Sequence, residues 1–285
     1  MKAKDNLFKV KSTLNICGNL MDLGTPKIMG ILNVTPDSFY SGSRSQEVAS
    51  SIQIGQAMLS AGADILDIGG YSTRPGADDI SIEEELNRVI PVIKGIASES
   101  PEAIISIDTF RSVVARKAVE AGASIINDVS GGNLDGQMFQ TVADLGVPYI
   151  LMHMRGTPQT MKELNDYDHL LNDIAKELDE KKQRLLKLGV SDIVIDPGFG
   201  FAKNISQNYE ILRNLGYLKR LKLPILAGVS RKSMIYKTLK LSPEEALNGT
   251  TALNMAVLIN GASILRVHDV KEAAETVKLF QAYKG

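Results

Sequence analysis

Polar residues that can do chemistry follow the short apolar runs of this 285-residue chain. They stand at or just after the ends of eight runs, at Asn33, Asp67, Asp108, Asn127, His153, Asp196, Ser230 and Arg266. A single residue of this kind often caps the helix that follows it. Eight of them are more than capping explains, so we interpret these residues as the lining of one site.

The last two runs predict an anion site. Arg266 and His268 are two residues apart, so on a strand their side chains share a face. Ser230, Arg231 and Lys232 follow the run before, and in eight-stranded barrels the ends of the last two strands commonly bind phosphate. The chain has neither a Walker A loop nor a GxGxxG after a strand, so nucleotide binding through those motifs is not predicted.

Two carboxylates and an amide add hydrogen-bonding groups to the same strand ends. Asp108 or Asp196 can accept two parallel hydrogen bonds from the N–C–N edge of a guanidine, an aminopyrimidine or a pterin, and Asn127 can both donate and accept. Cation binding is the competing interpretation, because Mg²⁺ needs only one or two protein oxygens when phosphates supply others. Asn33 could serve there with a diphosphate substrate. The three histidines lack the HxH or HxxxH spacing of a zinc site.

Two polar segments, residues 33–45 and 69–79, are rich in Gly, Pro and Ser. Loops of this kind between a strand and a helix can close over a substrate and exclude water. Phe39, Thr73 and Arg74 lie in them. An aromatic ring, a hydroxyl and a guanidinium favour a lid over ordinary surface loops.

The apolar runs alternate eight times with longer segments of helical periodicity. The runs are continuous in apolar character, as in parallel strands that are covered on both faces. We expect strands at residues 27–32, 65–68, 104–107, 124–126, 149–152, 193–195, 225–229 and 263–267. We expect helices at residues 46–61, 82–97, 111–121, 136–145, 164–188, 207–215, 243–260 and 270–283. Eight such units predict an α/β fold, a single (β/α)₈ TIM barrel.

Two further patterns refine this fold. Glycines after helical segments predict left-handed helix ends at Gly62, Gly122, Gly146, Gly189, Gly216 and Gly261. Residues 1–26 contain an alternating apolar pattern around a turn at Cys17, which predicts an N-terminal β-hairpin that plugs the lower end of the barrel. We therefore divide the chain into this extension and one catalytic barrel domain at residues 27–285.

Composition excludes several classes of protein. Lys and Arg number 32 and Asp and Glu 33, for a net charge of −1, so no long-range field attracts nucleic acid or a membrane surface. A single cysteine rules out an intrachain disulfide framework and multi-cysteine metal sites. No apolar stretch approaches the ~18 residues of a membrane span, and the N-terminal segment lacks a signal-peptide core. We expect a cytoplasmic protein with small-molecule substrates and neither nucleic acid nor membrane as a partner.

Eight strings carry a resemblance to a known family. They are MGILNVTPDSF, DIGGYSTRPGA, SIDT, IINDVSG, LMHM, DPGFGF, GVSRKSM and RVHDV, in this order between residues 29 and 270. In order and spacing they resemble the dihydropteroate synthases. The resemblance implies a TIM-barrel transferase that condenses 6-hydroxymethyl-7,8-dihydropterin diphosphate with p-aminobenzoate in folate synthesis, giving 7,8-dihydropteroate and diphosphate. It also implies Mg²⁺ as cofactor, inhibition by sulfonamides and a homodimer formed through barrel helices.

The resemblance assigns roles residue by residue. The implied catalytic residues are Asn33, Asp37, Thr73, Arg74, Lys232, Arg266 and His268, and Asn33 is the implied Mg²⁺ ligand. The implied pterin diphosphate contacts are Thr73, Asp108, Asn127, Met152, Asp196, Gly228, Lys232, Arg266 and His268. The implied p-aminobenzoate pocket is Phe39, Thr73, Pro75, Phe201, Ser230 and Lys232.

The chain departs from the family pattern at two places. Tyr40-Ser41 stands where the family commonly has Ser-Asp, and Tyr71 stands where Glu is common. These departures leave open the details of the p-aminobenzoate pocket and the response to sulfonamides.

Three other functions are compatible with parts of the pattern. A pterin-dependent methyltransferase has a similar barrel, but the Asn33 and Thr73 loops and the Arg266 and His268 pair favour diphosphate chemistry. A Schiff-base aldolase would use a strand-end lysine such as Lys232, which borohydride trapping would detect. A catalytically silent pterin-binding module would bind its ligand without releasing diphosphate.

The leaving group suggests the mechanism. Diphosphate that departs from a methylene on an electron-rich dihydropterin leaves a delocalised cation, so we predict an SN1-like path. Mg²⁺, Arg266 and His268 would stabilise the leaving charge. The arylamine is neutral at pH 7 and needs no strong base.

Overall fold

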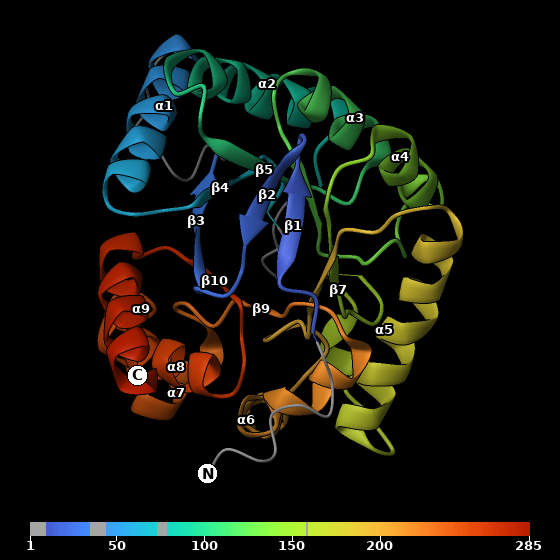
Figure 1. The fold of residues 1–285 in the computed structure, drawn as a ribbon, viewed down its shortest axis with the longest axis vertical. Helices are drawn as coiled ribbons and strands as arrows, with labels where there is room; N and C mark the ends of the chain where they lie inside the picture. The colour runs from blue at the N-terminus through green and yellow to red at the C-terminus, as the bar shows by residue number, and fades with distance from the viewer. Residues whose placement is uncertain (1–9, 35–43, 73–78, 158) are drawn as a thin grey trace.

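A computed structural model describes residues 10–34, 44–72, 79–157 and 159–285 of the chain. Eight parallel strands form one sheet in the order β8-β7-β6-β5-β4-β3-β10-β9. A parallel bridge between Ile195 and Ile225 joins the two edges of this sheet. The sheet therefore closes into a barrel, and the helices lie outside it (Figure 1). The predicted TIM barrel is confirmed.

The elements follow the predicted alternation of strand and helix. The barrel strands are β3 Lys27–Asn33, β4 Ile65–Gly69, β5 Ile104–Asp108, β6 Ile125–Asp128, β7 Tyr149–Met152, β8 Ile193–Asp196, β9 Leu226–Ala227 and β10 Ile264–Val267. The helices are α1 Arg44–Ser60, α2 Ile82–Glu99, α3 Ser112–Glu120, α4 Met138–Leu145, α5 Leu170–Lys187, α6 Ile205–Arg213, α7 Ser233–Leu239, α8 Leu247–Ile259 and α9 Val270–Lys284. Of the helices in the described ranges, none is both long and apolar enough to cross a membrane.

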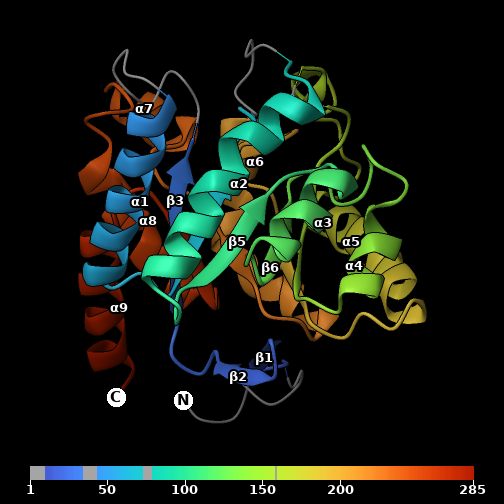
Figure 2. The same ribbon diagram turned by 90° about the horizontal axis from the view of Figure 1, so that it is seen from above.

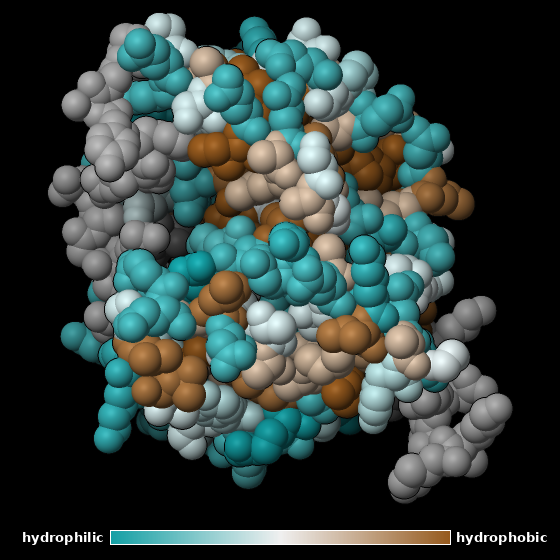
Figure 3. Space-filling model, turned by 90° about the vertical axis from the view of Figure 1, so that its left-hand side faces the viewer, coloured by the Kyte–Doolittle hydropathy of each residue, from teal (hydrophilic) through white to brown (hydrophobic). Residues whose placement is uncertain are grey.

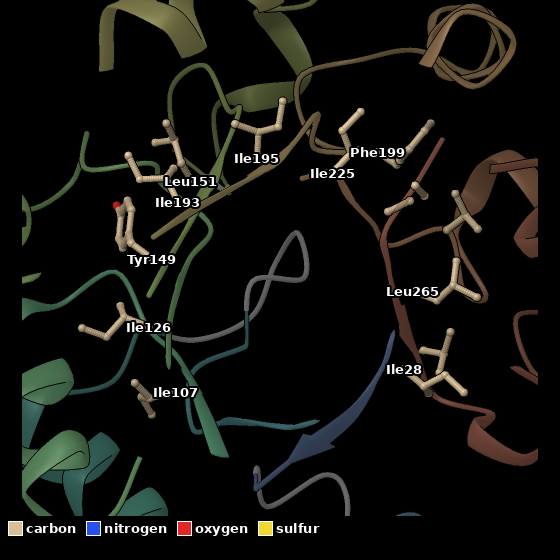
Figure 4. Close-up of a cluster of buried hydrophobic side chains, with 14 of the residues drawn as sticks. Ile28, Ile107, Ile126, Tyr149, Leu151, Ile193, Ile195, Phe199, Ile225 and Leu265 are labelled. Carbon is tan, nitrogen blue, oxygen red and sulfur yellow. The ribbon is translucent and has the colours of Figure 1, made fainter. Parts of the chain in front are cut away.

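Side chains alternate along each strand between the helices and the barrel interior. Those that face the helices, such as Ile107 and Leu265, belong to one large apolar cluster, which Figure 4 shows around the barrel wall. Burial stabilises the fold by roughly 1.5–3 kcal/mol for each large apolar side chain. On β10, Leu265 and Val267 face the helices, whereas Ile264 and Arg266 point inward. The predicted inward and outward faces of this strand are confirmed.

The N-terminal hairpin consists of β1 Thr13–Ile16 and β2 Asn19–Asp22. It lies across the end of the barrel at which β3 begins (Figure 2). A second buried cluster joins hairpin residues to interior residues of the strands and comprises Leu14, Ile16, Met21, Leu23, Met29, Ile65, Ile125, Ile150, Val194, Leu226 and Ile264. The predicted plug at the lower end of the barrel is confirmed.

Local signals account for several element ends. The Ser81 side chain caps α2 by accepting a hydrogen bond from the backbone N–H of Glu84. Asn204 and Gln207 form a reciprocal capping box at the start of α6. Five of the six glycines expected to end helices have a left-handed φ, namely Gly62, Gly122, Gly146, Gly189 and Gly261.

Three local predictions are wrong. The helix expected from residue 164 begins only at Leu170, because the segment before it makes tertiary contacts, including a hydrogen bond from the Tyr167 hydroxyl to the Ala202 carbonyl. Gly216 lacks a left-handed φ because the chain continues there as a 3₁₀ helix, Leu215–Leu221, which ends at the left-handed Lys222. Helix α7 was not expected, and α8 begins four residues later than predicted.

Candidate active site at the carboxyl ends of the strands

The barrel interior changes from apolar to polar toward the carboxyl ends of the strands. Ile65, at the plugged end of β4, is followed two residues later on the same face by Asp67. On β10, Ile264 is followed in the same way by Arg266. The strand ends therefore bring together charged groups that are far apart in the sequence, as their pattern predicts.

An ion-pair network around the fully buried Asp67 forms the floor of this end. The Arg266 guanidinium donates through Nε to Asp67 Oδ2 at 2.6 Å and through Nη2 to Asp108 Oδ2 at 2.5 Å. Asn127 Nδ2 donates to the same oxygen of Asp67 at 3.0 Å. Two of the expected pterin contacts, Asp108 and Asn127, are therefore held around one arginine.

Two carboxylates share this guanidinium, and their proximity shifts the pKa values of Asp108 and Arg266. Burial raises the pKa of Asp108 to about 7, and the Asp67 charge raises it further against the opposing effect of Arg266. Burial opposes the charge of Arg266, but the two carboxylates raise the pKa of the guanidinium well above its ordinary value. Arg266 thus stays cationic beneath the site.

The sequence placed Asp67 among the residues that line the site but assigned it no specific role. It is completely buried, and its Oδ1 atom has no hydrogen-bond partner among the residues that the structure describes. A charge inside the apolar run ILDIG, two residues after the inward-facing Ile65, was the available signal. That spacing places the carboxylate inside the barrel rather than at a helix cap.

Lys232 and Asp196 are two further charged residues of the site. The Lys232 ammonium donates to the Phe199 carbonyl oxygen and lies 5.0 Å from the centre of the Phe201 ring. Burial lowers the pKa of Lys232 to about 8, although the Asp196 carboxylate opposes the shift. Burial also raises the pKa of Asp196, and Lys232 opposes that shift. Asp196 Oδ1 accepts from the Gly198 N–H at 2.7 Å, which leaves Oδ2 for a ligand.

Ser230 and His268 close the side of the site at the last two strands. Ser230 Oγ lies 3.0 Å from His268 Nδ1 and also accepts from the His268 backbone N–H at 3.2 Å. Ser230 is buried, whereas His268 is exposed. A Cβ atom on Gly228 would lie 3.7 Å from both Arg266 Cβ and Lys232 Nζ. Gly228 is therefore also at the site, where it leaves space between the two cationic residues.

An apolar wall borders the charged groups. It is formed by Val129, Met152, Met154, Met161 and Ala202, with Phe110, Leu134 and Phe201 packed against them. Met152 and Phe201, two of the expected ligand contacts, both belong to it. A flat ring can pack on this wall while its edge reaches the carboxylates.

Two strand-end residues do not join the site. The His153 ring is buried and lies within 3.0 Å of Glu177 and of Lys203, away from the charged floor. The Arg231 guanidinium forms a bidentate pair with Asp269 at 2.7 and 2.9 Å and also donates to two backbone carbonyls. Arg231 therefore does not belong to the anion cluster in which its position after β9 had placed it.

Asn33 could contribute one oxygen ligand to a cation. A Cβ atom built on Gly69 would lie 3.7 Å from Asn33 Oδ1 and 3.6 Å from Asp108 Oδ2, so both side chains border the same glycine. Asn33 makes no side-chain hydrogen bond to the described residues, and a carboxamide oxygen suits Mg²⁺. Within the described ranges, no cluster of three His, Cys, Asp or Glu residues could hold a metal. These residues fit Mg²⁺ only as a shared ion with most ligands from substrate and water.

The match to known proteins decides the family. Residues 29–268 match the model of the pterin binding enzymes. The chain is 43% identical over 267 residues to the dihydropteroate synthase of Escherichia coli strain K12, which covers 93% of this chain and 94% of the relative. The chain belongs to the dihydropteroate synthase family. It is also 44% identical over 258 residues to the Synechocystis member, covering 90% of this chain and 89% of the relative.

Solved structures of dihydropteroate synthases have the same fold. The Yersinia pestis enzyme with a sulfonamide drug superposes with a TM-score of 0.89 at 40% identity, covering 95% of this chain and 99% of the other. The Xanthomonas albilineans enzyme with 4-aminobenzoic acid superposes with a TM-score of 0.90 at 39% identity, covering 97% and 99%. The same enzyme with 7,8-dihydropteroate gives a TM-score of 0.86 at 36% identity, covering 96% and 99%.

Several residues that the dihydropteroate synthase pattern singles out lie outside the described ranges. These are Asp37, Phe39, Tyr40, Ser41, Thr73, Arg74 and Pro75. Their implied roles in catalysis, in diphosphate binding and in the p-aminobenzoate pocket stay predictions.

The residues that flank the second polar segment are firmly held. Arg88 Nη1 donates to the Gly70 carbonyl at 3.1 Å, and Arg111 Nη2 donates to the Ile80 carbonyl at 2.6 Å. Arg111 is in turn paired with the buried Glu85 at 2.9 Å. Tyr71 stands where the family commonly has Glu. The Arg111 guanidinium carbon lies 5.2 Å from the centre of the Tyr71 ring. Both ends of the segment are thus fixed by helices α2 and α3.

Proposed function

We propose that this chain joins 6-hydroxymethyl-7,8-dihydropterin diphosphate to p-aminobenzoate, releasing diphosphate and forming 7,8-dihydropteroate. The observation that carries this proposal is the site itself, in which acceptors on Asp108, Asn127 and Asp196 converge with the ammonium of Lys232. It occurs in a chain 43% identical to a dihydropteroate synthase along nearly its whole length. The reaction is an alkyl transfer in folate biosynthesis.

The side chains of the site can recognise the polar edges of a pterin ring. Asn127 Nδ2 is occupied by Asp67, so its Oδ1 faces the ligand as an acceptor. Asp196 Oδ2 can accept from the N–C–N edge, since Oδ1 is held by the Gly198 N–H. Lys232 uses one of its three N–H groups on the Phe199 carbonyl, which leaves two for a ring acceptor.

The chemical step separates a diphosphate anion from a ring that can carry positive charge. The carboxyl groups of Asp67 and Asp108 lie beneath the site, where their oxygen atoms favour a cationic ring. We assign the leaving diphosphate to Arg266, whose Nη1 donates to no described residue, and to His268. Asn33 would hold Mg²⁺, which when bound neutralises charge on the departing group. An SN1-like path follows: the C–O bond to diphosphate breaks, the neutral arylamine nitrogen then bonds to the methylene carbon, and the proton that it loses passes to solvent, so that no strong base is needed.

The p-aminobenzoate side of the site is proposed at Phe201, Lys232 and Ser230. The cation–π arrangement of Lys232 over Phe201 gives an aromatic carboxylate both a ring contact and a counter-charge. A dihydropteroate synthase has been solved with a sulfonamide drug, and we propose that sulfonamides compete here for the same site.

The decisive experiment is a direct assay of dihydropteroate formation. The purified chain is given the pterin diphosphate, p-aminobenzoate and Mg²⁺, and the product is measured by chromatography. We expect product that depends on both substrates, that is lost on adding EDTA and that is abolished in Asp196→Asn. No product from the folded wild-type chain would overturn the proposal.

We further propose a cytoplasmic homodimer formed through barrel helices. Large apolar side chains are exposed on and beside α7–α9, at Leu239, Leu241, Ile259, Leu279 and Tyr283. Figure 3, which views the α1 and α9 side, shows hydrophobic patches among hydrophilic side chains. Sedimentation at micromolar concentration would test the dimer, and a monomer would contradict it.

The presence of a single cysteine supports a reducing compartment such as the cytoplasm. Cell fractionation would test this location.

A further inference from the structure

The segment between β8 and α6, residues 197–204, supplies two contacts of the proposed site. The Phe199 carbonyl oxygen accepts from the Lys232 ammonium, and the Phe201 ring lies 5.0 Å from the same nitrogen. The position of this β8–α6 loop therefore decides where the Lys232 charge and the Phe201 ring lie relative to a substrate.

The β8–α6 loop has a backbone conformation that needs stabilising contacts. Ala202 has a φ of 50°, a left-handed conformation that costs an L-residue with a Cβ atom free energy. Gly198 has a φ of 71°, and a Cβ atom there would lie 2.1 Å from the His153 carbonyl oxygen. The loop thus packs closely on the end of β7 in a strained conformation.

Lys203 belongs to the loop, and its side chain folds back beneath it to supply part of that support. Its buried ammonium donates to the carbonyl oxygens of Gly198 at 3.1 Å and Phe201 at 2.8 Å. Its third partner is His153 Nδ1 at 3.0 Å. Three N–H groups thus meet three acceptors, two of them in the loop.

His153 links this ammonium to a carboxylate. Because Lys203 donates to Nδ1, the ring is neutral with its proton on Nε2, which lies 3.0 Å from Glu177 Oε2. Burial and the Lys203 charge lower the pKa of His153 to about 4, which keeps it neutral. Glu177 is further held by Arg155 through Nε at 3.0 Å.

A second contact reaches the loop from the segment before α5. The Tyr167 hydroxyl donates to the Ala202 carbonyl at 2.9 Å, and the Arg155 guanidinium lies 4.0 Å from the centre of the Tyr167 ring. Arg155 therefore connects both supports of the loop through Glu177 and Tyr167. None of these side chains lies on the charged floor of the site.

We propose that Lys203 is a positioning residue, which through His153 and Glu177 fixes the β8–α6 loop so that Phe201 and the Phe199 carbonyl set the arylamine side of the site. This inference rests on the proposed function. Loss of the Lys203 ammonium should loosen Phe201 while leaving Asp108, Asn127 and Asp67 in place. The arylamine should therefore be affected more than the pterin.

The kinetic test compares Lys203→Met with Lys182→Met. Lys182 is a matched control, since its ammonium also donates to a backbone carbonyl, that of Leu221 at 3.3 Å, but outside the site. We expect Lys203→Met to raise KM for p-aminobenzoate about tenfold or more, the effect of losing a charged hydrogen bond, with a change below about threefold in the Kd of a pterin. Lys182→Met should change neither. Equal effects of Lys203→Met on both ligands would overturn the proposal.

A fluorescence test reports on the loop without catalysis. The chain contains no tryptophan, so Phe201→Trp introduces a single reporter on the loop. In that background Lys203→Met should increase quenching of the tryptophan by acrylamide, whereas Lys182→Met should not. This measurement remains decisive if the wild-type chain makes no dihydropteroate, and unchanged quenching would contradict the positioning role.

A milder variant covers the case in which Lys203→Met does not fold. Glu177→Gln keeps a side chain of the same size and leaves Lys203 in place, but removes the charge that anchors His153. We expect a smaller rise in KM for p-aminobenzoate, about threefold, in the same direction. A rise confined to the KM for the pterin diphosphate would count against the proposal.

Discussion

The two ends of the barrel interior are built by the same strands yet differ completely in character. Where the hairpin closes the barrel, β4 and β10 contribute Ile65 and Ile264 to an apolar cluster. Two residues further along each strand, Asp67 and Arg266 form an ion pair at 2.6 Å. About 6.6 Å of strand therefore separates the apolar residues that pack against the hairpin from the charged residues of the site. Stability can be concentrated at the plugged end, while the polar end keeps buried charges that serve a ligand.

If the polar end serves function, the largest effect should follow from Asp67→Asn. The change removes the charge that holds Arg266 Nε, and it weakens the hydrogen bond that the Asp67 side chain accepts from Asn127 Nδ2. We expect kcat/KM for the pterin diphosphate to fall about 100-fold or more, because loss of a buried charged hydrogen bond misplaces two ligand contacts. Steady-state kinetics measure this. Ser106→Ala, which removes a neighbouring buried hydroxyl that has no partner in the described ranges, is the control and should retain activity within about threefold.

The plugged end should show the reverse behaviour. Leu14 is 1% exposed in the hairpin cluster, so Leu14→Ala should lower the free energy of unfolding by about 2–5 kcal/mol. Urea denaturation measures the loss, and the activity of the folded fraction should be unchanged. Leu20→Ala, at a hairpin position that is 72% exposed, should cost less than about 0.5 kcal/mol. A loss of activity in folded Leu14→Ala would break the division between the ends.

The polar end should also respond to pH. Lys232 has a pKa lowered to about 8 by burial, so its ammonium is present below that pH and is lost as the pH rises through it. We expect kcat/KM for the pterin diphosphate to fall above pH 8, by about tenfold per pH unit once the lysine is neutral. The pH profile of Lys232→Arg, though lower overall, should lack this alkaline fall, because a guanidinium stays charged.

The smallest expected effect concerns backbone strain near the site. Ala202→Gly removes the Cβ atom from a residue with a φ of 50°. Relief of about 1–2 kcal/mol of strain exceeds the roughly 0.5–1 kcal/mol that glycine costs through the unfolded chain. We expect a slightly higher melting temperature by calorimetry. Gly146→Ala, at a helix end with a φ of 63°, should have the opposite sign.

Much of the site could be predicted from the order of residues. The face of a strand on which a side chain lies, and the residue at which a strand ends, both depend on the local sequence. Asp108, Asn127, Asp196, Lys232 and Arg266 stand where a closed parallel barrel must bring them together. Arg231 was placed with them wrongly, because its bidentate pair with Asp269 joins segments 38 residues apart. The role of Asp67 was missed for the same reason, since its partner Arg266 is 199 residues away.

The sequence by itself determined the eight strand and helix units, the inward parity of Arg266, the hairpin and the family. These depend on apolar periodicity and on strings of adjacent residues, which are visible along the chain. Only the tertiary structure decided which charges pair, and so which of them remain for a ligand. It also showed that Lys203, unremarked among 32 basic residues, buries its side chain beneath the β8–α6 loop to which it belongs. Such pairings depend on how distant elements pack and exclude water, which no local pattern contains.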